Sequence, residues 1–261
     1  MITSLQNPRI KIVQQLLSDR KAREESKSLV VEGVRLAEEA LLNHWQPQFA
    51  LWSTQLNERG KQVLNQLTQL QIPVEEIPVP MMNKISDTET PQGLLMVLAQ
   101  KTQTLADNLN FLLALDGVRD PGNLGTILRT ASAFGAQGAI LLPGCADLFS
   151  SKVLRAAMGA HFRLPAFNMT VEELESLCKA KTIPAMKILL ADMDGAQPCW
   201  SVDLRQPMAL VIGGEAAGAS AQLYTIADGK VLIPMPSGSE SLNAAVAASI
   251  LLYEIMRQRQ T

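Results

Sequence analysis

The chain has 261 residues, a length that favours two domains at about 150 residues per domain. Hydrophobic residues make up 47% and charged residues 18%, which excludes a disordered chain and suffices for a packed core. The formal net charge of −2 excludes binding to nucleic acid by bulk charge alone, but it leaves local basic patches open.

The cysteines and the N-terminal sequence narrow the class further. Cys145, Cys178 and Cys199 form no Cys-X-X-Cys pair, so neither a disulfide framework nor a zinc site is expected, and we predict no metal. The start lacks the apolar stretch of a signal peptide, and no run approaches the roughly 18 apolar residues of a membrane span. We therefore expect a cytoplasmic protein without a membrane segment.

The first residues of the chain are polar and locally basic. Apolar residues recur with a helical period between Ile10 and Leu17, which predicts a helix over Pro8–Arg23 with a basic outer face. Such a face is either an ordinary solvated surface or a contact for a phosphate backbone, and the sequence leaves both open.

Strands and helices are then predicted in alternation up to residue 100. The expected strands are Ser28–Gly33, Phe49–Ser53, Ile72–Pro80 and Gly93–Ala99. The expected helices are Val34–Asn43, Gly60–Leu70 and Met81–Ile85. This alternation predicts a small α/β domain over residues 1–100, and the polar segment 101–110 is the predicted linker.

From Phe111 onward the strands become short, continuous apolar runs. They are Phe111–Leu115, Ala139–Leu142, Ile188–Leu190, Ala209–Ile212 and Val231–Pro234. The helical stretches between and after them are Leu124–Phe134, Val153–Met158, Val171–Ala180 and Leu242–Arg257. Continuous apolar strands are typical of a parallel sheet covered on both faces, so residues 111–261 are predicted to form an open α/β domain. Ligands of such sheets bind at the carboxyl ends of the strands.

The loop after the first of these strands contains a strong turn, Asp-Pro-Gly-Asn. Asn123 is placed to cap the helix that follows, either as a plain N-cap or as a site residue. Arg129 lies in an otherwise apolar helix, where it makes an ion pair or serves a site. Six residues separate the two, so on an ideal helix they need not share a face.

The loop after Ala209–Ile212 is rich in glycine. Gly213, Gly214 and Gly218 allow a close approach of backbone amides to a ligand, and Glu215 between them is an ordinary surface acid when taken alone. The loop does not match the dinucleotide fingerprint, and no phosphate-loop pattern is present in the chain.

The loop after Val231–Pro234 leads into the last helix. Ser241 is a candidate cap for this helix, and Asn243 is an unusual residue for a first helical turn because its side chain competes for backbone hydrogen bonds. A capped core helix explains the alanines that follow but leaves Asn243 unexplained.

In their order and spacing the three loops resemble the signature motifs of the SpoU/TrmH branch of the SPOUT methyltransferases. The matching residues are Asn123, Gly125 and Arg129 in the first motif, Gly214, Glu215 and Gly218 in the second, and Ile233, Met235, Gly238, Ser241, Leu242 and Asn243 in the third. The resemblance covers Phe111 to about Arg259. The first domain is similar, more loosely, to the L30e-like substrate-binding domain that often precedes such a catalytic domain.

The resemblance implies an activity and a fold that periodicity does not show. It implies methyl transfer from S-adenosylmethionine to a ribose 2′-hydroxyl of rRNA or tRNA by a homodimer with shared sites. It also implies a C-terminal trefoil knot, a feature too rare to predict otherwise. The implied cofactor-binding residues are Gly213, Gly214, Gly218, Ile233, Met235, Ser241 and Leu242. The implied catalytic residues are Asn123, Arg129, Glu215, Ser241 and Asn243.

Two departures from the family pattern fall in these motifs. Gly214 stands where the second motif usually has Asn, and Ala244-Ala245 stand where the third often continues Val-Ser. A guanidinium has a pKa above about 12, so we expect Arg129 to bind a phosphate or hydroxyl oxygen and to stabilise a developing oxyanion, whether or not it also takes the proton.

Three alternative functions are left open by the sequence. They are a nucleotide-dependent oxidoreductase, an RNA-binding assembly factor without catalysis, and a relative that methylates a base.

Overall fold

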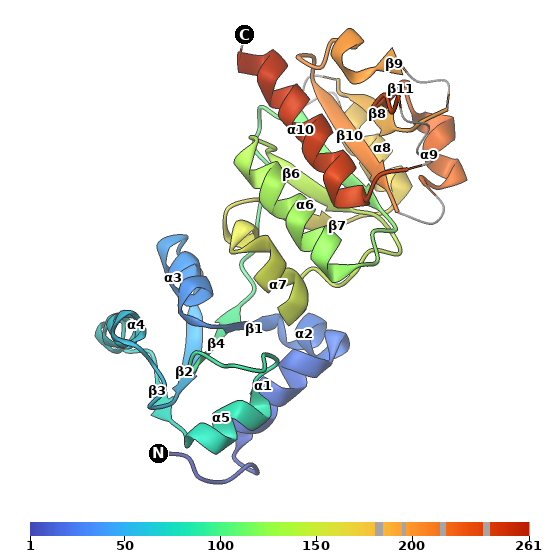
Figure 1. Ribbon diagram of the computed structural model, residues 1–261. Helices are drawn as coiled ribbons and strands as arrows, with labels where there is room; N and C mark the ends of the chain where they lie inside the picture. Colours follow the sequence, from blue (N-terminus) through green and yellow to red (C-terminus); the bar gives the residue numbers. More distant parts are fainter. Residues whose placement is uncertain (181–184, 195–196, 215–217, 237–240, 261) are drawn as a thin grey trace. The chain divides into compact units, whose positions relative to one another are not determined.

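The computed structural model describes residues 1–180, 185–194, 197–214, 218–236 and 241–260 (Figure 1). Contacts within the chain divide it into two compact units. The first unit is Met1–Thr102 with Asp147–Phe162, and the second unit is Gln103–Ala146 with Arg163–Thr261. This division differs from the predicted one, in which every residue from 111 onward lies in one domain. The reason is packing, because Leu154 and Phe162 are buried in a core of the first unit.

The first unit contains a four-stranded sheet in the order β1-β4-β2-β3. Its strands are β1 (Ser28–Glu32), β2 (Pro47–Trp52), β3 (Val74–Glu76) and β4 (Leu94–Ala99). β4 pairs antiparallel with β1 and β2, and β2 pairs parallel with β3. Neighbouring residues of β4 enter different cores, Met96 and Leu98 one and Leu95 and Val97 the other. The sheet is therefore covered on both faces.

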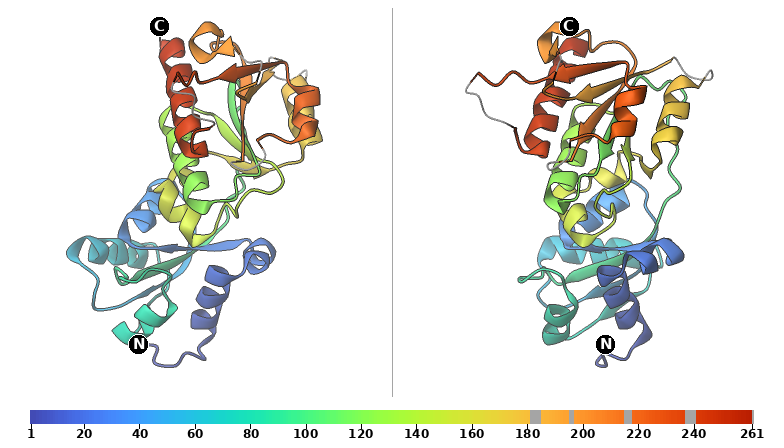
Figure 2. Two further views of the ribbon diagram at one scale, coloured as in Figure 1. Left: turned by 45° about the vertical axis from the view of Figure 1, so that its right-hand side comes forward. Right: turned by 90° about the vertical axis from the view of Figure 1, so that its right-hand side faces the viewer.

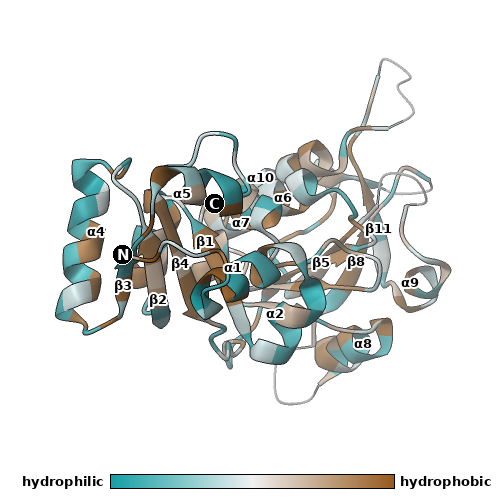
Figure 3. Cartoon of the chain, turned by 90° about the horizontal axis from the view of Figure 1, so that it is seen from below, coloured by the Kyte–Doolittle hydropathy of each residue, from teal (hydrophilic) through white to brown (hydrophobic). Residues whose placement is uncertain are grey.

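The helices of the first unit come from both of its segments. They are α1 (Pro8–Ser18), α2 (Arg20–Ser26), α3 (Val34–Leu42), α4 (Glu58–Gln69), α5 (Val79–Ile85), α7 (Ser151–Ala157) and the short 3-10 helix η1 (Ala160–Phe162). Figure 3 shows hydrophilic and hydrophobic faces on α4, whose buried residues Val63 and Leu67 lie one turn apart.

The single helix predicted over Pro8–Arg23 is wrong. Asp19 has an extended backbone and its side chain accepts a hydrogen bond from the Lys21 amide, so it ends α1 and caps α2. The kink turns Arg23 inward, where it is 5% exposed and forms an ion pair with Asp147. Arg23 therefore does not belong to the basic outer face that the sequence predicted.

The second unit contains a seven-stranded sheet in the order β7-β6-β5-β10-β8-β11-β9, parallel throughout. Its strands are β5 (Phe111–Asp116), β6 (Gly138–Leu141), β7 (Ala166–Asn168), β8 (Lys187–Ala191), β9 (Gln197–Pro198), β10 (Met208–Gly213) and β11 (Gly229–Leu232). β10 enters between β5 and β8, both of which precede it in the chain. Its carboxyl end thereby lies beside that of β5.

Helices cover both faces of this sheet. They are α6 (Pro121–Ala133), α8 (Val171–Lys179), α9 (Ala221–Ile226), α10 (Ala244–Gln260) and the 3-10 helix η2 (Cys199–Ser201). α6 and α10 lie side by side on one face, whereas α8 and α9 lie on the other (Figures 1 and 2). All residues of β5 and β6 are buried, which confirms the predicted continuous apolar strands. No helix in the described part of the chain has the length and apolarity needed to cross a membrane.

Candidate functional site

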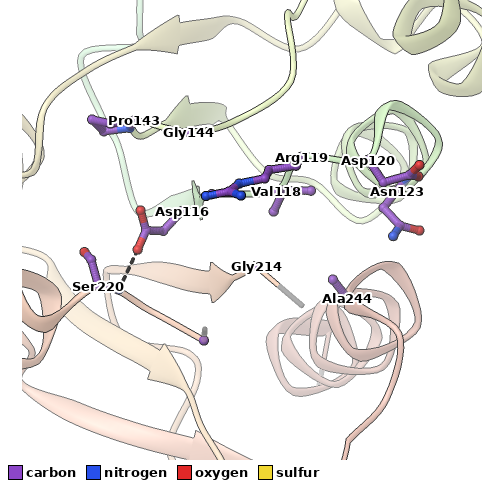
Figure 4. A pocket seen from close by; sticks show the side chains of 12 residues that line it. Asp116, Val118, Arg119, Asp120, Asn123, Pro143, Gly144, Gly214, Ser220 and Ala244 are labelled. Atoms are coloured by element: carbon purple, nitrogen blue, oxygen red, sulfur yellow. Dashed lines mark hydrogen bonds between the residues drawn. The ribbon is translucent and has the colours of Figure 1, made fainter. Parts of the chain in front are cut away.

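A cavity of about 320 Å³ lies in the second unit at the carboxyl ends of β5 and β10 (Figure 4). We call it the Asp116 cavity. Its other walls come from the loop after β5, the first turns of α6 and α10, and Ser220. Asp116 is 7% exposed and its carboxylate accepts a hydrogen bond of 2.6 Å from the Ser220 amide, which ties the end of β5 to the loop after β10.

Glycines form much of the wall of this cavity. At some positions a side chain would clash with neighbouring backbone, and at others a side chain would occupy the cavity itself. A Cβ on Gly214 would lie 2.4 Å from the carbonyl oxygen of Gly117, and one on Gly213 would lie 2.3 Å from the backbone of Gly218. Gly117 and Gly218 have φ near +65°, a conformation that favours glycine, and a Cβ on either would meet almost nothing. The glycine at 214, where the family pattern has Asn, thus follows from the close approach of Gly117.

The first and third motifs meet through a pair of asparagines. Asn243 donates a hydrogen bond of 3.1 Å from Nδ2 to Oδ1 of Asn123, although 120 residues separate them. The Oδ1 atom of Asn243 accepts hydrogen bonds from the amides of Ala245 and Val246. One side chain therefore caps α10 and holds the start of α6 beside it.

Two predicted caps are wrong. Asp120, not Asn123, caps α6, because Pro121 occupies the first helical position and the Asp120 carboxylate accepts a hydrogen bond from the Asn123 amide at 2.7 Å. Asn243, not Ser241, has the capping contacts to α10. The side chain of Asn123 instead accepts a hydrogen bond from Asn243, and the side chain of Ser241 lines a second cavity.

The second cavity, of about 130 Å³, lies at the end of β11 and the start of α10. We call it the Met235 cavity, and Ile233, Met235, Ser241 and Leu242 all line it. Its walls are mainly apolar, with Asp192 as an acidic group. Burial alone would raise the pKa of Asp192, but hydrogen bonds from the Asp194 amide, Lys230 and Tyr224 together lower the pKa and keep the carboxylate ionised.

The predicted site residues are therefore only partly brought together. Gly214, Gly218 and Asn123 line the Asp116 cavity, and four residues of the third motif line the Met235 cavity: Ile233, Met235, Ser241 and Leu242. Gly213 and Asn243 line neither cavity. Arg129 lies on an exposed face of α6 and lines neither cavity. Glu215 and Gly238 lie outside the described residues.

Two cavity residues were missed as site candidates. Asp116 ends a buried strand in an apolar run, and Arg119 extends across the cavity toward it in Figure 4. A charged residue directly after a predicted strand was the available signal for Asp116. In the described part of the chain, no group of three or more His, Cys, Asp or Glu side chains could hold a metal ion.

Two family models match separate stretches of the chain. The model described as SpoU rRNA Methylase family matches residues 110–253, and one described as MRM3-like substrate binding domain matches residues 7–96. A 23S rRNA (uridine(2479)-2'-O)-methyltransferase from Streptomyces viridochromogenes is 33% identical over 99% of this chain and 92% of its own. The human mitochondrial rRNA methyltransferase 3 is 32% identical over 96% of this chain and 72% of its own.

Solved structures of methyltransferases are also similar to this chain over nearly its whole length. The SpoU methyltransferase AviRb from Streptomyces viridochromogenes, in complex with the cofactor AdoMet, superposes with a TM-score of 0.88 at 29% identity and covers 98% of this chain and 99% of its own. The AdoMet-bound rRNA methyltransferase from Sinorhizobium meliloti has a TM-score of 0.86 at 31% identity and covers 98% and 97%.

Proposed function

The chain belongs to the SpoU family of rRNA methylases, and we propose that it transfers a methyl group from S-adenosylmethionine to a ribose 2′-hydroxyl of ribosomal RNA. The observation that carries this proposal is the hydrogen bond between Asn123 and Asn243, which joins the first and third motifs beside a glycine-lined cavity. A relative that aligns with 99% of this chain is named as a 23S rRNA 2′-O-methyltransferase.

The two cavities of the second unit fit the proposed methyl donor. Ile233, Met235 and Leu242 offer apolar walls for an adenine ring, and the ionised Asp192 offers an acceptor for a ribose hydroxyl. Gly117 and Gly218 leave room that any side chain would fill. When bound, S-adenosylmethionine supplies a methyl group activated by the positive sulfur that carries it.

In this proposal the protein mainly aligns the two reactants. Asn123 and Asn243 orient groups at the junction of α6 and α10, and Asp116 holds the loop after β10 in place. Holding a hydroxyl in line with a methyl group supplies a large part of the rate. Arg129 binds a phosphate or hydroxyl oxygen of the RNA and stabilises the negative charge that develops on the hydroxyl oxygen as it loses its proton. That oxygen bonds to the methyl group as the bond between methyl and sulfur breaks, which leaves S-adenosylhomocysteine.

Arg129 requires a second subunit for this role. It lines neither cavity of its own chain, so we place Arg129 of the partner subunit at the methyl-transfer site. α10 offers a surface for such a homodimer, because Val246, Ile250 and Tyr253 recur at helical spacing and are 48%, 38% and 52% exposed. An exposed apolar stripe on a helix is typical of an interface between protein surfaces.

Three further features of the family complete the proposal. We carry over the C-terminal trefoil knot, supported by the entry of β10 between strands that precede it. We also carry over an L30e-like fold for residues 1–100 joined by a linker at 101–110, supported by the match to a substrate-binding domain. The predicted cytoplasmic location goes with the RNA substrate.

The proposal is tested first by binding and then by product analysis. Calorimetric titration with S-adenosylmethionine, with NADH as control, is expected to show saturable binding of the methyl donor alone. Incubation with protein-free rRNA and labelled donor is expected to yield 2′-O-methylated nucleotides. A base-methylated product would contradict the ribose assignment, and RNA binding without any methyl transfer would favour a non-catalytic assembly factor.

Complementation between two inactive variants tests the shared site. Leu242→Glu places a charge in the Met235 cavity, and Arg129→Ala removes the guanidinium; each homodimer is expected to be inactive. If the site is shared, a mixed dimer has one complete site, so a one-to-one mixture regains roughly a quarter of wild-type activity. No recovery, with subunit exchange verified, would place Arg129 in its own subunit's site.

A further inference from the structure

The first unit has a cavity of its own, of about 310 Å³, lined by both polar and apolar residues. We call it the Arg35 cavity. It lies where β1 ends and α3 begins, and the loop 86–92 and the end of α7 complete it. Its volume lies within the range of about 300–1,000 Å³ that small-ligand pockets have. None of its residues belongs to the three motifs.

The loop 86–92 is held in place by buried acidic groups. The Glu32 carboxylate is 7% exposed and accepts hydrogen bonds from the Asp87 amide, at 3.0 Å, and from the Thr88 hydroxyl. Gln92 accepts a hydrogen bond of 3.0 Å from the Val34 amide at the start of α3. These contacts satisfy both oxygen atoms of Glu32 and tie the loop to the end of β1. The cavity is thus preformed.

Two arginines give the cavity its charge. Arg35 is exposed, and it has no ion pair or hydrogen bond with any residue that the structure describes. Arg155 contacts Asp87 at 2.8 Å through Nη2, and Asp87 also accepts a hydrogen bond of 2.7 Å from Ser151. The pair fixes Arg155 against the loop, and its Nη1 atom is buried without a hydrogen-bond partner. The exposed Arg35 guanidinium therefore retains its donors for an anion, and Arg155 adds positive charge beside it.

Several cations of the N-terminal helices are paired with acidic residues. On α1 and α2, Arg9 pairs with Glu75, Arg20 with Glu24 and Lys21 with Glu25. These pairs neutralise part of the basic face predicted from the sequence, whereas Arg35 at the cavity has no such pair among the described residues.

Met158 contributes an apolar wall in an unusual backbone conformation. It caps the end of α7 with φ of +49°, a region where glycine is favoured and long side chains are uncommon. Its side chain, partly exposed, lines the cavity together with Leu36. Because glycine would be less strained at this position, the presence of methionine indicates that its side chain contributes to the cavity. A flexible thioether can pack against a flat ring.

From these contacts we propose that the Arg35 cavity binds one nucleotide of the RNA substrate. Arg35 holds its phosphodiester and Arg155 adds positive charge beside it. Thr88, Thr90 and Gln92 offer polar contacts at the rim, and Met158 packs against the base. A guanidinium matches the geometry of a phosphate, and unpaired bases are recognised by packing and by edge contacts. This inference rests on the proposed function, since it names part of the surface that holds the rRNA.

Two variants with matched controls test the proposal in the full-length chain. Arg35→Ala removes an exposed guanidinium from the second position of α3, and Arg59→Ala does the same at the second position of α4. Met158→Gly removes a side chain at positive φ, and Gln71→Gly does so at φ of +59°. Both glycine variants should fold about as stably as the wild type, because relief of backbone strain offsets the greater conformational entropy that glycine gives the unfolded chain.

Filter binding to protein-free 23S rRNA is the main readout. Arg35→Ala is expected to raise the Kd about tenfold and to lower the salt dependence by roughly one released ion, and Met158→Gly to raise the Kd severalfold. Both controls should stay within about twofold of the wild type, and S-adenosylmethionine affinity should not change in any variant. Rescue of most of the affinity by Arg35→Lys would support a role for the charge.

Wild-type affinity for rRNA in both Arg35→Ala and Met158→Gly would overturn the proposal. The methyl signal of Met158, followed by NMR with uridine 5′-monophosphate and with inorganic phosphate, separates the sources of the phosphate group. Tight binding of the free nucleotide without any effect of Arg35→Ala on rRNA affinity would make the cavity a nucleotide pocket and would overturn the RNA assignment. If the wild type transfers no methyl group but its rRNA affinity still depends on Arg35, the proposed reaction is contradicted and the nucleotide-binding site is still supported.

Discussion

The candidate sites of the two units are built from different parts of the chain. In the second unit the Asp116 cavity is shaped mainly by backbone, with Gly117, Gly214 and Gly218 in close approach and Asn243 capping α10. In the first unit the Arg35 cavity is shaped by the side chains of Arg35 and Arg155 above a buried acidic group. A backbone-built site requires glycine at fixed positions and leaves a motif in the sequence, whereas a side-chain-built site does not.

The largest expected effect concerns Arg129, a proposed catalytic side chain that lines neither cavity of its own chain. Arg129→Ala is expected to lower kcat by about a hundredfold or more, because it removes stabilisation of charge in the transition state. S-adenosylmethionine affinity should stay near the wild-type value in calorimetry. Arg205→Ala, which removes an exposed arginine of the same unit, is the control. Robust turnover by Arg129→Ala would remove this residue from the mechanism.

A single methyl group tests the backbone-built cavity directly. Gly214→Ala places a Cβ 2.4 Å from a carbonyl oxygen, so the free energy of unfolding is expected to fall by about 1–3 kcal/mol. Affinity for S-adenosylmethionine should fall with it, since the end of β10 must shift. Gly229→Ala, whose Cβ would meet only the tip of Leu189 at 3.3 Å, should be close to neutral. Equal effects of the two changes, measured by denaturant titration, would contradict the close approach at Gly214.

In the first unit, we expect acid to lower the free energy of unfolding through protonation of His161. This buried imidazole contacts the Leu148 carbonyl through Nε2 at 2.8 Å, and burial lowers its pKa from 6.5 to about 4. Between these values the unfolded chain binds a proton that the folded chain does not, so stability falls as pH falls. The loss is expected to reach about 2 kcal/mol between pH 7 and pH 5. Urea titrations should show a weaker pH dependence in His161→Phe, and an unchanged slope would contradict the assignment.

The smallest effect separates the two roles of Asn243. Asn243→Ala removes the cap of α10 and should cost about 1 kcal/mol of stability. Asn243→Asp keeps an oxygen for the Ala245 and Val246 amides but loses the Nδ2 donor to Asn123. It should unfold like the wild type yet transfer methyl groups more slowly. Loss of activity only in the variant that also loses stability would reduce Asn243 to a structural cap.

Much of the fold follows from local sequence, and the misses have physical causes. The buried strands of the second unit were predicted because continuous apolar runs are unambiguous when glycine or polar loops bound them. β7 and β9, with three and two residues, are too short for such a pattern. The break at Asp19 depends on one side-chain cap within a continuous helical period. The burial of Arg23 depends on Asp147, which is 124 residues away in the chain.

The site was predicted in the same uneven way. Spacing brought out Asn123, Gly218 and Asn243 because each matches a motif, but it misassigned the caps of α6 and α10. Proline at the first helical position after Asp120 was the overlooked signal for α6. The Arg35 cavity could not be predicted, because its walls come from three separate segments of the chain and meet only in the folded first unit.

The assignment of Asp147–Phe162 to the first unit has a consequence for the chain's modularity. The polypeptide passes between the units three times, after Thr102, after Ala146 and after Phe162. A protease cut in the segment 101–110 would therefore leave the two units covalently joined. A fragment ending at residue 102 would lack α7 and η1, and Trp45 would lose the aromatic partners Phe149 and Phe162. Genetic exchange of the substrate-binding unit between relatives must accordingly transplant two stretches of sequence together.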